Sequence, residues 1–256
     1  MAALAALLNL APPYLGAVVL VFLRIGASMA LLPAFGELMI PGRVRLALTL
    51  AFTAIVVPAV APALAAAEAG RPLLTLAGGE VLAGLMLGMS LRFVVIGLQL
   101  AGTMAAQATS LAQLLGGASV EPQPALGLVL LLGALALVTS LGLHVQMAAM
   151  FIGSYDILGP GAAPVPGDVA RWGTALAGGA FRMGFLFAMP FVAASLVYNL
   201  ALGVINRAMP QLMVALVGAP AITFGALLLL ALAAPEILAL WQVALEERLA
   251  DPFGPP

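Results

Sequence analysis

The side chains that could support acid–base or nucleophilic chemistry are few. His144 is the only histidine, and Ser154 and Asp156 follow it in the same apolar region. A serine nucleophile needs a base within hydrogen-bond reach, whereas one histidine without other nearby ligands cannot build a zinc site. An intramembrane hydrolase using these three residues therefore stays an open alternative. The simpler interpretation of His144 is a hydrogen-bonded histidine between helices.

Known catalytic patterns are absent from the sequence. It contains no Gly-x-Ser-x-Gly, no His-Glu-x-x-His and no phosphate-binding Gly-Lys-Ser/Thr loop. It also contains no cysteine, which excludes disulfides, thiolate nucleophiles and cysteine-ligated metals. We therefore predict a protein that is not an enzyme and that uses neither a metal nor a cofactor.

The composition is that of a membrane protein. Hydrophobic residues make up 64% of the chain and charged residues 7%, and the mean hydropathy is +1.20. A soluble domain carries about 25% charged residues, because its surface must face water. The net charge of −1 gives no reason to expect a nucleic-acid partner. We predict a single membrane-associated domain over residues 1–256 that contacts the lipid bilayer.

Six apolar segments approach the length of about 20 residues that a membrane-spanning helix needs. They cover residues 14–32, 44–62, 73–100, 125–152, 169–202 and 212–234, with glycine, proline and polar residues between them. The second has only a short run before Pro58, about 21 Å as a helix, and Pro190 interrupts the fifth. The sequence predicts an all-α membrane protein of about six long, partly kinked helices.

Several charged side chains fall inside these segments, namely Arg24, Glu80, Arg92 and Arg182. A central arginine costs about 2.5 to 3.5 kcal/mol on insertion scales, so such residues usually face protein or water. We expect the arginines to be sheltered by neighbouring subunits. Snorkelling toward the membrane surface is the alternative, above all for Arg182.

Two further stretches have unusual polarity. Gly84 and Gly88 form a Gly-x-x-x-Gly pattern, which predicts close helix packing without specifying a partner. Residues 101–124 are polar but nearly uncharged, and such backbone at membrane depth must be buried in protein or line an aqueous path. This stretch is a candidate lumen-facing loop or plug. An interfacial helix followed by a turn is an equally good interpretation.

Several motifs follow one another along the chain. The first block is Arg24, Pro33-x-Phe35-Gly36, Pro41-x-Arg43-Val44-Arg45 and Pro58. The central elements are Ala101-Gly102 with Gln107, then Gly142-x-His144 and Ser154-Tyr155-x-x-Leu158. The last and most specific motif is Asn206-Arg207-x-x-Pro210-Gln211-Leu212 with Gly218-x-Pro220. Together, and in this order over essentially the whole chain, these motifs resemble the FliR/SctT family of type III secretion export-gate subunits, and the last motif favours the flagellar branch.

This resemblance implies a structural subunit of the flagellar export gate. Such a chain joins FliP and FliQ in a helical pore assembly that contacts FlhB and FlhA and conducts unfolded export substrates. It implies a multi-pass protein of the bacterial inner membrane, in the flagellar basal body. The fold would resemble a fusion of a FliP-like part, about residues 1–200, with a FliQ-like hairpin and tail, about residues 169–256.

The resemblance also locates a plug near residues 107–124. The candidate plug or lumen residues are Gln107, Leu111, Gln113, Leu114, Leu115, Gly116 and Gly117. The sequence departs from the family here, with Ala108-Thr109 in place of the usual Met-Gly and leucines in place of plug phenylalanines. The remaining alternatives are a virulence-type export subunit and a small-molecule secondary transporter.

Overall fold

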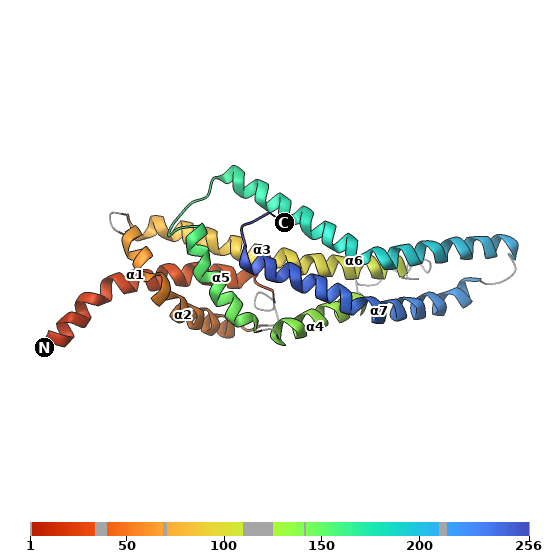
Figure 1. Ribbon diagram of the computed structural model, residues 1–256, viewed down its shortest axis with the longest axis horizontal. Coiled ribbons are helices and arrows are strands. Elements are labelled where there is room, and N and C mark those ends of the chain that lie inside the picture. The colour runs from red at the N-terminus through yellow and green to blue at the C-terminus, as the bar shows by residue number, and fades with distance from the viewer. Residues whose placement is uncertain are drawn as a thin grey trace. The chain divides into compact units, whose positions relative to one another are not determined.

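The computed structural model describes residues 2–33, 40–68, 71–109, 125–140, 142–209 and 214–255, with side chains for all of these except 2–14, 68, 125, 206 and 214–220. Seven α-helices form the secondary structure of these residues (Figure 1). They are α1 (Ala2–Leu31), α2 (Gly42–Glu68), α3 (Leu73–Thr109), α4 (Ala125–Ser140), α5 (Leu143–Ile157), α6 (Pro166–Ala208) and α7 (Val214–Ala250). The predicted all-α class is confirmed.

Within the described residues, four helices are long and apolar enough to cross a membrane, or five if α4 and α5 count as one broken span. The prediction of about six is therefore slightly too high. The apolar part of α1, Leu15–Leu31, is shorter than a full span. The fourth predicted segment is interrupted at Gly142, whose φ of 68° is left-handed and therefore ends a regular helix.

Proline marks where several helices begin. The carbonyl of Pro41 accepts the N–H groups of Val44 and Arg45 at the start of α2, and Pro166 is the first residue of α6. Proline suits the first helical turn, because an N–H group at that position would have no acceptor within the helix. Interior prolines do not end the helices, however. α2 is 27 residues long, about 40 Å, and continues through Pro58, so the prediction of a short second segment is wrong.

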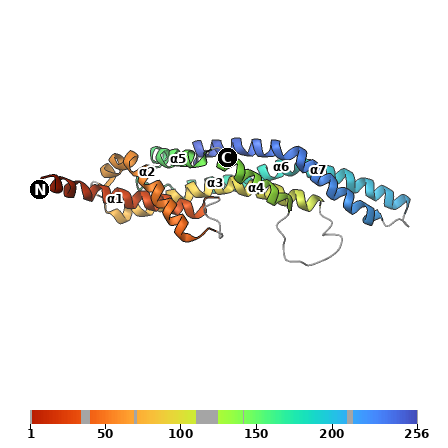
Figure 2. The same cartoon turned by 90° about the horizontal axis from the view of Figure 1, so that it is seen from below.

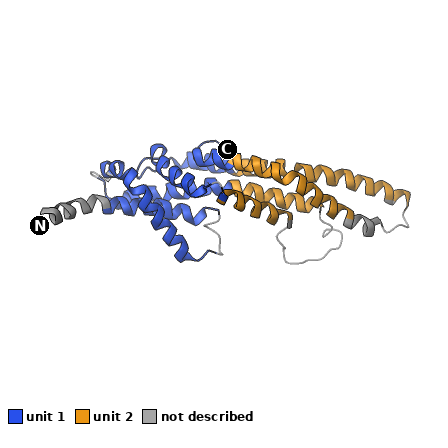
Figure 3. Ribbon diagram, turned by 60° about the horizontal axis from the view of Figure 1, so that its bottom comes forward, with its two compact units in different colours: residues 1–93, 140–176, 245–256 blue, residues 94–139, 177–244 orange. Residues whose placement is uncertain are grey.

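The chain divides into two compact units (Figure 3). Unit 1 comprises Met1–Phe93, Ser140–Leu176 and Leu245–Pro256. In this unit α1 packs along α2, as Figures 1 and 2 show, and α2 also contacts α5. Unit 2 comprises Val94–Thr139 and Ala177–Ala244. Each unit therefore combines segments that are distant in the sequence.

Glycines bring the backbones of neighbouring helices into contact. In unit 1, a Cβ atom added at Gly88 would lie 2.5 Å from the carbonyl oxygen of Ser28, and one at Gly84 would overlap the carbonyl of Arg24. The Gly-x-x-x-Gly pattern is thus confirmed as a packing device, and its partner is α1 of the same chain. In unit 2, Gly102 makes a similar close approach to Gly127 and joins α3 to α4.

The contact between α1 and α3 can be tested with a Gly88→Ala variant. The new methyl group forces the two backbones apart, with an expected loss of about 1 to 3 kcal/mol, as for overpacked cores. In isolated membranes the variant should therefore unfold at a lower temperature, measured by its protease resistance after heating. Gly78 is the matched control, because a Cβ atom there meets nothing within 4 Å. Equal melting temperatures for Gly88→Ala and Gly78→Ala would contradict the packing.

Candidate functional site

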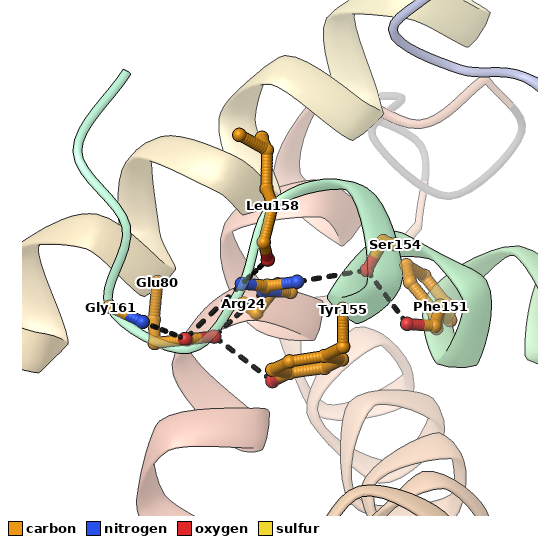
Figure 4. A network of polar contacts seen from close by, with 7 residues as sticks. All are labelled: Arg24, Glu80, Phe151, Ser154, Tyr155, Leu158 and Gly161. Atoms are coloured by element: carbon orange, nitrogen blue, oxygen red, sulfur yellow. Dashed lines mark hydrogen bonds and ion pairs between the residues drawn. The ribbon is translucent and has the colours of Figure 1, made fainter. Parts of the chain in front are cut away.

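A buried ion pair between α1 and α3 is the main polar feature of unit 1. Arg24 and Glu80 each lie inside an apolar helix, and both are fully buried. Arg24 Nε donates to Glu80 Oε2 at 2.7 Å, and Nη2 donates to Oε1 at 3.2 Å (Figure 4). This two-point geometry is the strong form of an arginine–carboxylate pair.

The rest of the guanidinium is held by α5 and the residue that follows it. Nη1 donates to Ser154 Oγ at 3.0 Å, and Nη2 donates to the carbonyl oxygen of Leu158 at 3.0 Å. The guanidinium carbon lies 3.6 Å from the ring centroid of Tyr155. A desolvated arginine over an aromatic face gains further electrostatic stabilisation. The positive charge is therefore compensated from several sides.

The carboxylate of Glu80 is equally well satisfied. The hydroxyl of Tyr155 donates to Oε2 at 2.9 Å, and the N–H of Gly161 donates to Oε1 at 2.8 Å. Gly161 has a φ of 62°, and a Cβ atom on Gly79 would lie 2.5 Å from its carbonyl carbon. The turn before α6 thus packs directly on the backbone of α3. We call Arg24, Glu80, Ser154, Tyr155, Leu158 and Gly161 the Arg24 centre.

The donors and acceptors of the Arg24 centre are directed at one another, and Ser154 Oγ also donates to the carbonyl of Phe151 at 2.7 Å. His144 is exposed and lies about three turns earlier on α5, about 15 Å along the helix axis. Asp156 is exposed as well. His144 therefore lies beyond hydrogen-bond reach of Ser154, which weakens the hydrolase alternative.

The environment of the arginine side chains differs from one residue to the next. We expected neighbouring subunits to cover them, but Arg24 is buried by its own chain, so the expectation is wrong for this residue. Arg92 is half-buried and interacts within the chain. Arg182 is exposed. Glu80 lies inside a predicted segment, but the sequence did not reveal its pairing with Arg24. The available signal was the presence of opposite charges inside two separate apolar segments, because a buried charge needs a partner.

The other predicted site residues whose side chains the structure describes do not join the Arg24 centre. Pro33 follows α1, Pro41 precedes α2, and Arg43 and Arg45 lie in the first turn of α2, exposed and half-buried respectively. Exposed residues at helix ends are Gln107 on α3, His144 on α5 and Arg207 on α6. The backbone of Asn206 lies in α6 and the backbones of Gly218 and Pro220 lie in α7. The following lie outside the described residues: Leu111, Gln113, Leu114, Leu115, Gly116, Gly117, Pro210 and Gln211.

No metal or cofactor site is apparent in the described ranges. They contain no cluster of three or more histidine, cysteine, aspartate or glutamate side chains placed to hold a metal ion. A groove of about 400 Å³ lies between α5 and the end of α7, and Gln146, Ser154 and Glu246 supply its polar side chains. The hydroxyl of Ser154 is already used by Arg24 and Phe151, so the groove offers few free polar groups.

Comparison with known proteins gives matches along nearly the whole chain. The family described as "Bacterial export proteins, family 1" matches residues 15–248. The flagellar biosynthetic protein FliR of Caulobacter vibrioides is 32% identical over 240 residues, which cover 90% of this chain and 93% of that protein. FliR of Escherichia coli is 28% identical over 213 residues, or 82% and 81%. FliR of Pectobacterium carotovorum is 29% identical over 210 residues, or 78% and 77%. The range matched by the family includes the whole Arg24 centre.

An Arg24→Ala substitution tests the centre. It leaves the carboxylate of Glu80 buried without its counter-charge, which typically costs about 3 to 5 kcal/mol. We expect low accumulation in membranes and a lower unfolding temperature there, measured by protease resistance of the membrane-embedded protein after heating. The double variant Arg24→Leu/Glu80→Leu should be less destabilised than Arg24→Ala, because it buries no charge.

The control for this experiment is Arg171→Ala. Arg171 pairs with Asp168 on the surface of α6, where the two side chains are 83% and 60% exposed. Exposed pairs contribute about 0 to 1 kcal/mol, so this variant should behave like the wild type. If Arg24→Ala were no less stable than Arg171→Ala, the centre would have no structural role.

Proposed function

The chain belongs to family 1 of the bacterial export proteins, and from this membership we propose that it is a structural, FliR-type subunit of the flagellar protein export gate. In this proposal it joins FliP and FliQ to form the conduit for unfolded flagellar proteins, next to FlhB and FlhA. It is a multi-pass protein of the inner membrane, in the flagellar basal body. The similarity to FliR proteins over nearly the full length carries the proposal.

The burial of the long helices supports a place in a larger assembly. The span on α3 is 61% buried, whereas the spans on α6 and α7 are each only 17% buried. The α6 span has 40 residues, about 60 Å of helix, which is twice the hydrocarbon thickness of about 30 Å. Lipid alone cannot cover so long an apolar helix. Neighbouring export-gate subunits would cover the remainder, with residues 1–200 as the FliP-like part and 169–256 as the FliQ-like part.

We further propose that residues 107–124 act as the plug of the conduit. Gln107 is exposed near the end of α3, where this stretch begins. Leu111, Leu114 and Leu115 supply apolar side chains, and Gly116-Gly117 follows them. A ring of apolar side chains can close a pore by excluding water and reopen when a substrate enters. Such a plug needs no bound ion or cofactor.

A small-molecule secondary transporter is the weaker alternative. That class requires broken helices at corresponding positions of two halves, with charged sites near the membrane midplane. The broken pair of α4 and α5 is the only one among the described residues. The buried charges of the Arg24 centre neutralise one another, which leaves them poorly suited to hold a transported ion.

Co-expression tests the subunit role. We expect the chain to purify in one complex with FliP and FliQ, with a mass well above that of the chain, measured by native mass spectrometry. Expressed alone it should aggregate in detergent, because the faces of α6 and α7 stay uncovered. The gene should also restore motility to a host that lacks its own FliR. A well-behaved monomer that ignores both partners would argue for a solitary carrier.

Deleting residues 111–117 tests the plug. Without the apolar leucines the conduit should leak ions, while export of flagellar proteins continues. The measurement is membrane conductance or growth in high salt, alongside the amount of exported protein in the medium. A variant in which seven glycine and serine residues replace 111–117 keeps the loop length and should leak as well. Unchanged conductance in both variants would count against the plug.

A further inference from the structure

Arg182 differs from the other arginines that lie inside apolar helices. Arg24 is paired with Glu80, and Arg92 interacts within the chain. Arg182 is exposed near the middle of α6, and no side chain or carbonyl among the described residues pairs with it. An arginine inside a membrane segment normally faces protein or water. Whatever covers this part of α6 must therefore accommodate a guanidinium.

The surface around Arg182 is strongly apolar. Large side chains on the same side of α6 are substantially exposed, namely Phe181 at 58%, Phe185 at 45%, Leu186 at 54% and Met189 at 51%. Residues three and four positions apart are neighbours on a helix surface, so Phe185 and Leu186 lie beside Arg182 on its C-terminal side, and Met189 follows one turn later. We call Gly178, Phe181, Arg182, Phe185, Leu186 and Met189 the Arg182 face.

The opposite side of α6 is already occupied by unit 2. Ala188 and Phe191 are buried, and a Cβ atom added at Gly184 would lie 2.8 Å from Leu100 of α3. A helix with one side packed on its own chain cannot turn the Arg182 face inward. The face is therefore open to lipid, to water or to another protein, and its exposed large apolar side chains disfavour water.

Lipid alone does not suit this face. Residues 172–181 and 183–206 are both free of charge, so Arg182 separates two uncharged stretches of one helix. A bilayer core of about 30 Å holds only about 20 helical residues, so it cannot take both stretches. A lipid phosphate at the edge of the bilayer would reach Arg182 only if residues 172–181 or residues 183–206 lay outside the hydrocarbon core. A protein neighbour covers both flanks at once.

We propose that the Arg182 face is a docking surface for a helix of a neighbouring export-gate subunit, and that a carboxylate on that helix accepts hydrogen bonds from Arg182. The proposal rests on the proposed function, because the neighbour is a gate subunit. Charge complementarity determines the chemistry of the neighbour: an arginine desolvated by apolar side chains requires an anion, and the planar guanidinium matches a carboxylate at two points. The Arg24–Glu80 pair uses the same solution between two helices of this chain.

The proposal is tested by reversing the charge in the complete complex. In the complex with FliP and FliQ, an Arg182→Glu variant places two carboxylates opposite each other, which should lower the yield of purified complex at least about tenfold. Motile revertants of this variant should carry a second substitution that turns an aspartate or glutamate of another gate subunit into arginine or lysine. Arg171→Glu is the matched control on the same helix, because Arg171 is exposed and pairs locally with Asp168.

A photo-crosslinking residue in place of Phe185 identifies the neighbour directly. We expect a crosslink to another gate subunit in membranes. Crosslinks to lipid alone, or a complex of wild-type yield for Arg182→Glu, would overturn the docking surface while leaving the export role intact. If the neighbour were a second copy of this chain, Glu236, which is exposed on α7, would be the carboxylate that pairs with Arg182. Rescue of Arg182→Glu by Glu236→Arg would overturn the proposed neighbour in favour of a second copy. Failure of the wild-type chain to assemble would overturn both proposals.

Discussion

A guanidinium can be buried among apolar helices only if its charge and its N–H groups are compensated nearby, and unit 1 is organised around this requirement at Arg24. Glu80 on α3 supplies the counter-charge, and Ser154 and Tyr155 on α5 contact the remaining surface of the guanidinium. The carbonyl of Leu158 and the N–H of Gly161 extend the network to the turn before α6. Segments distant in the sequence are thereby held together by one set of directional interactions.

Close backbone packing and the ion pair support each other. Gly84 lies one turn after Glu80 on α3 and directly contacts the backbone of Arg24, so the two helices approach closely where the charges meet. A larger residue at this position would lengthen the contact between guanidinium and carboxylate. Small residues let membrane helices approach, because packing and not hydrophobic exclusion drives their association. The glycine pattern and the ion pair are therefore parts of one helix–helix contact.

The polar requirements of the two units are met differently. In unit 1 the buried charges are satisfied within the chain. In unit 2, α6 presents an arginine and several large apolar side chains that the chain itself leaves exposed. Such a division suits a protein that forms one stable part by itself and completes another by assembly. Membership of a family of bacterial export proteins agrees with a chain that works in a larger apparatus.

Composition and motifs were sufficient to assign the class of the protein. Low charge and long apolar segments required membrane helices, ordered motifs pointed to the FliR family, and the spacing of Gly84 and Gly88 predicted close packing. The identity of the charges that meet, in contrast, depends on the tertiary packing of the helices. The pairing of Arg24 with Glu80, and the contrast with exposed Arg182, depend on helices that are far apart in the chain. The structure also shows that α2 continues through Pro58. Local sequence rules predict that a helix ends at an interior proline, because one helical hydrogen bond is lost, but tertiary packing can offset that loss.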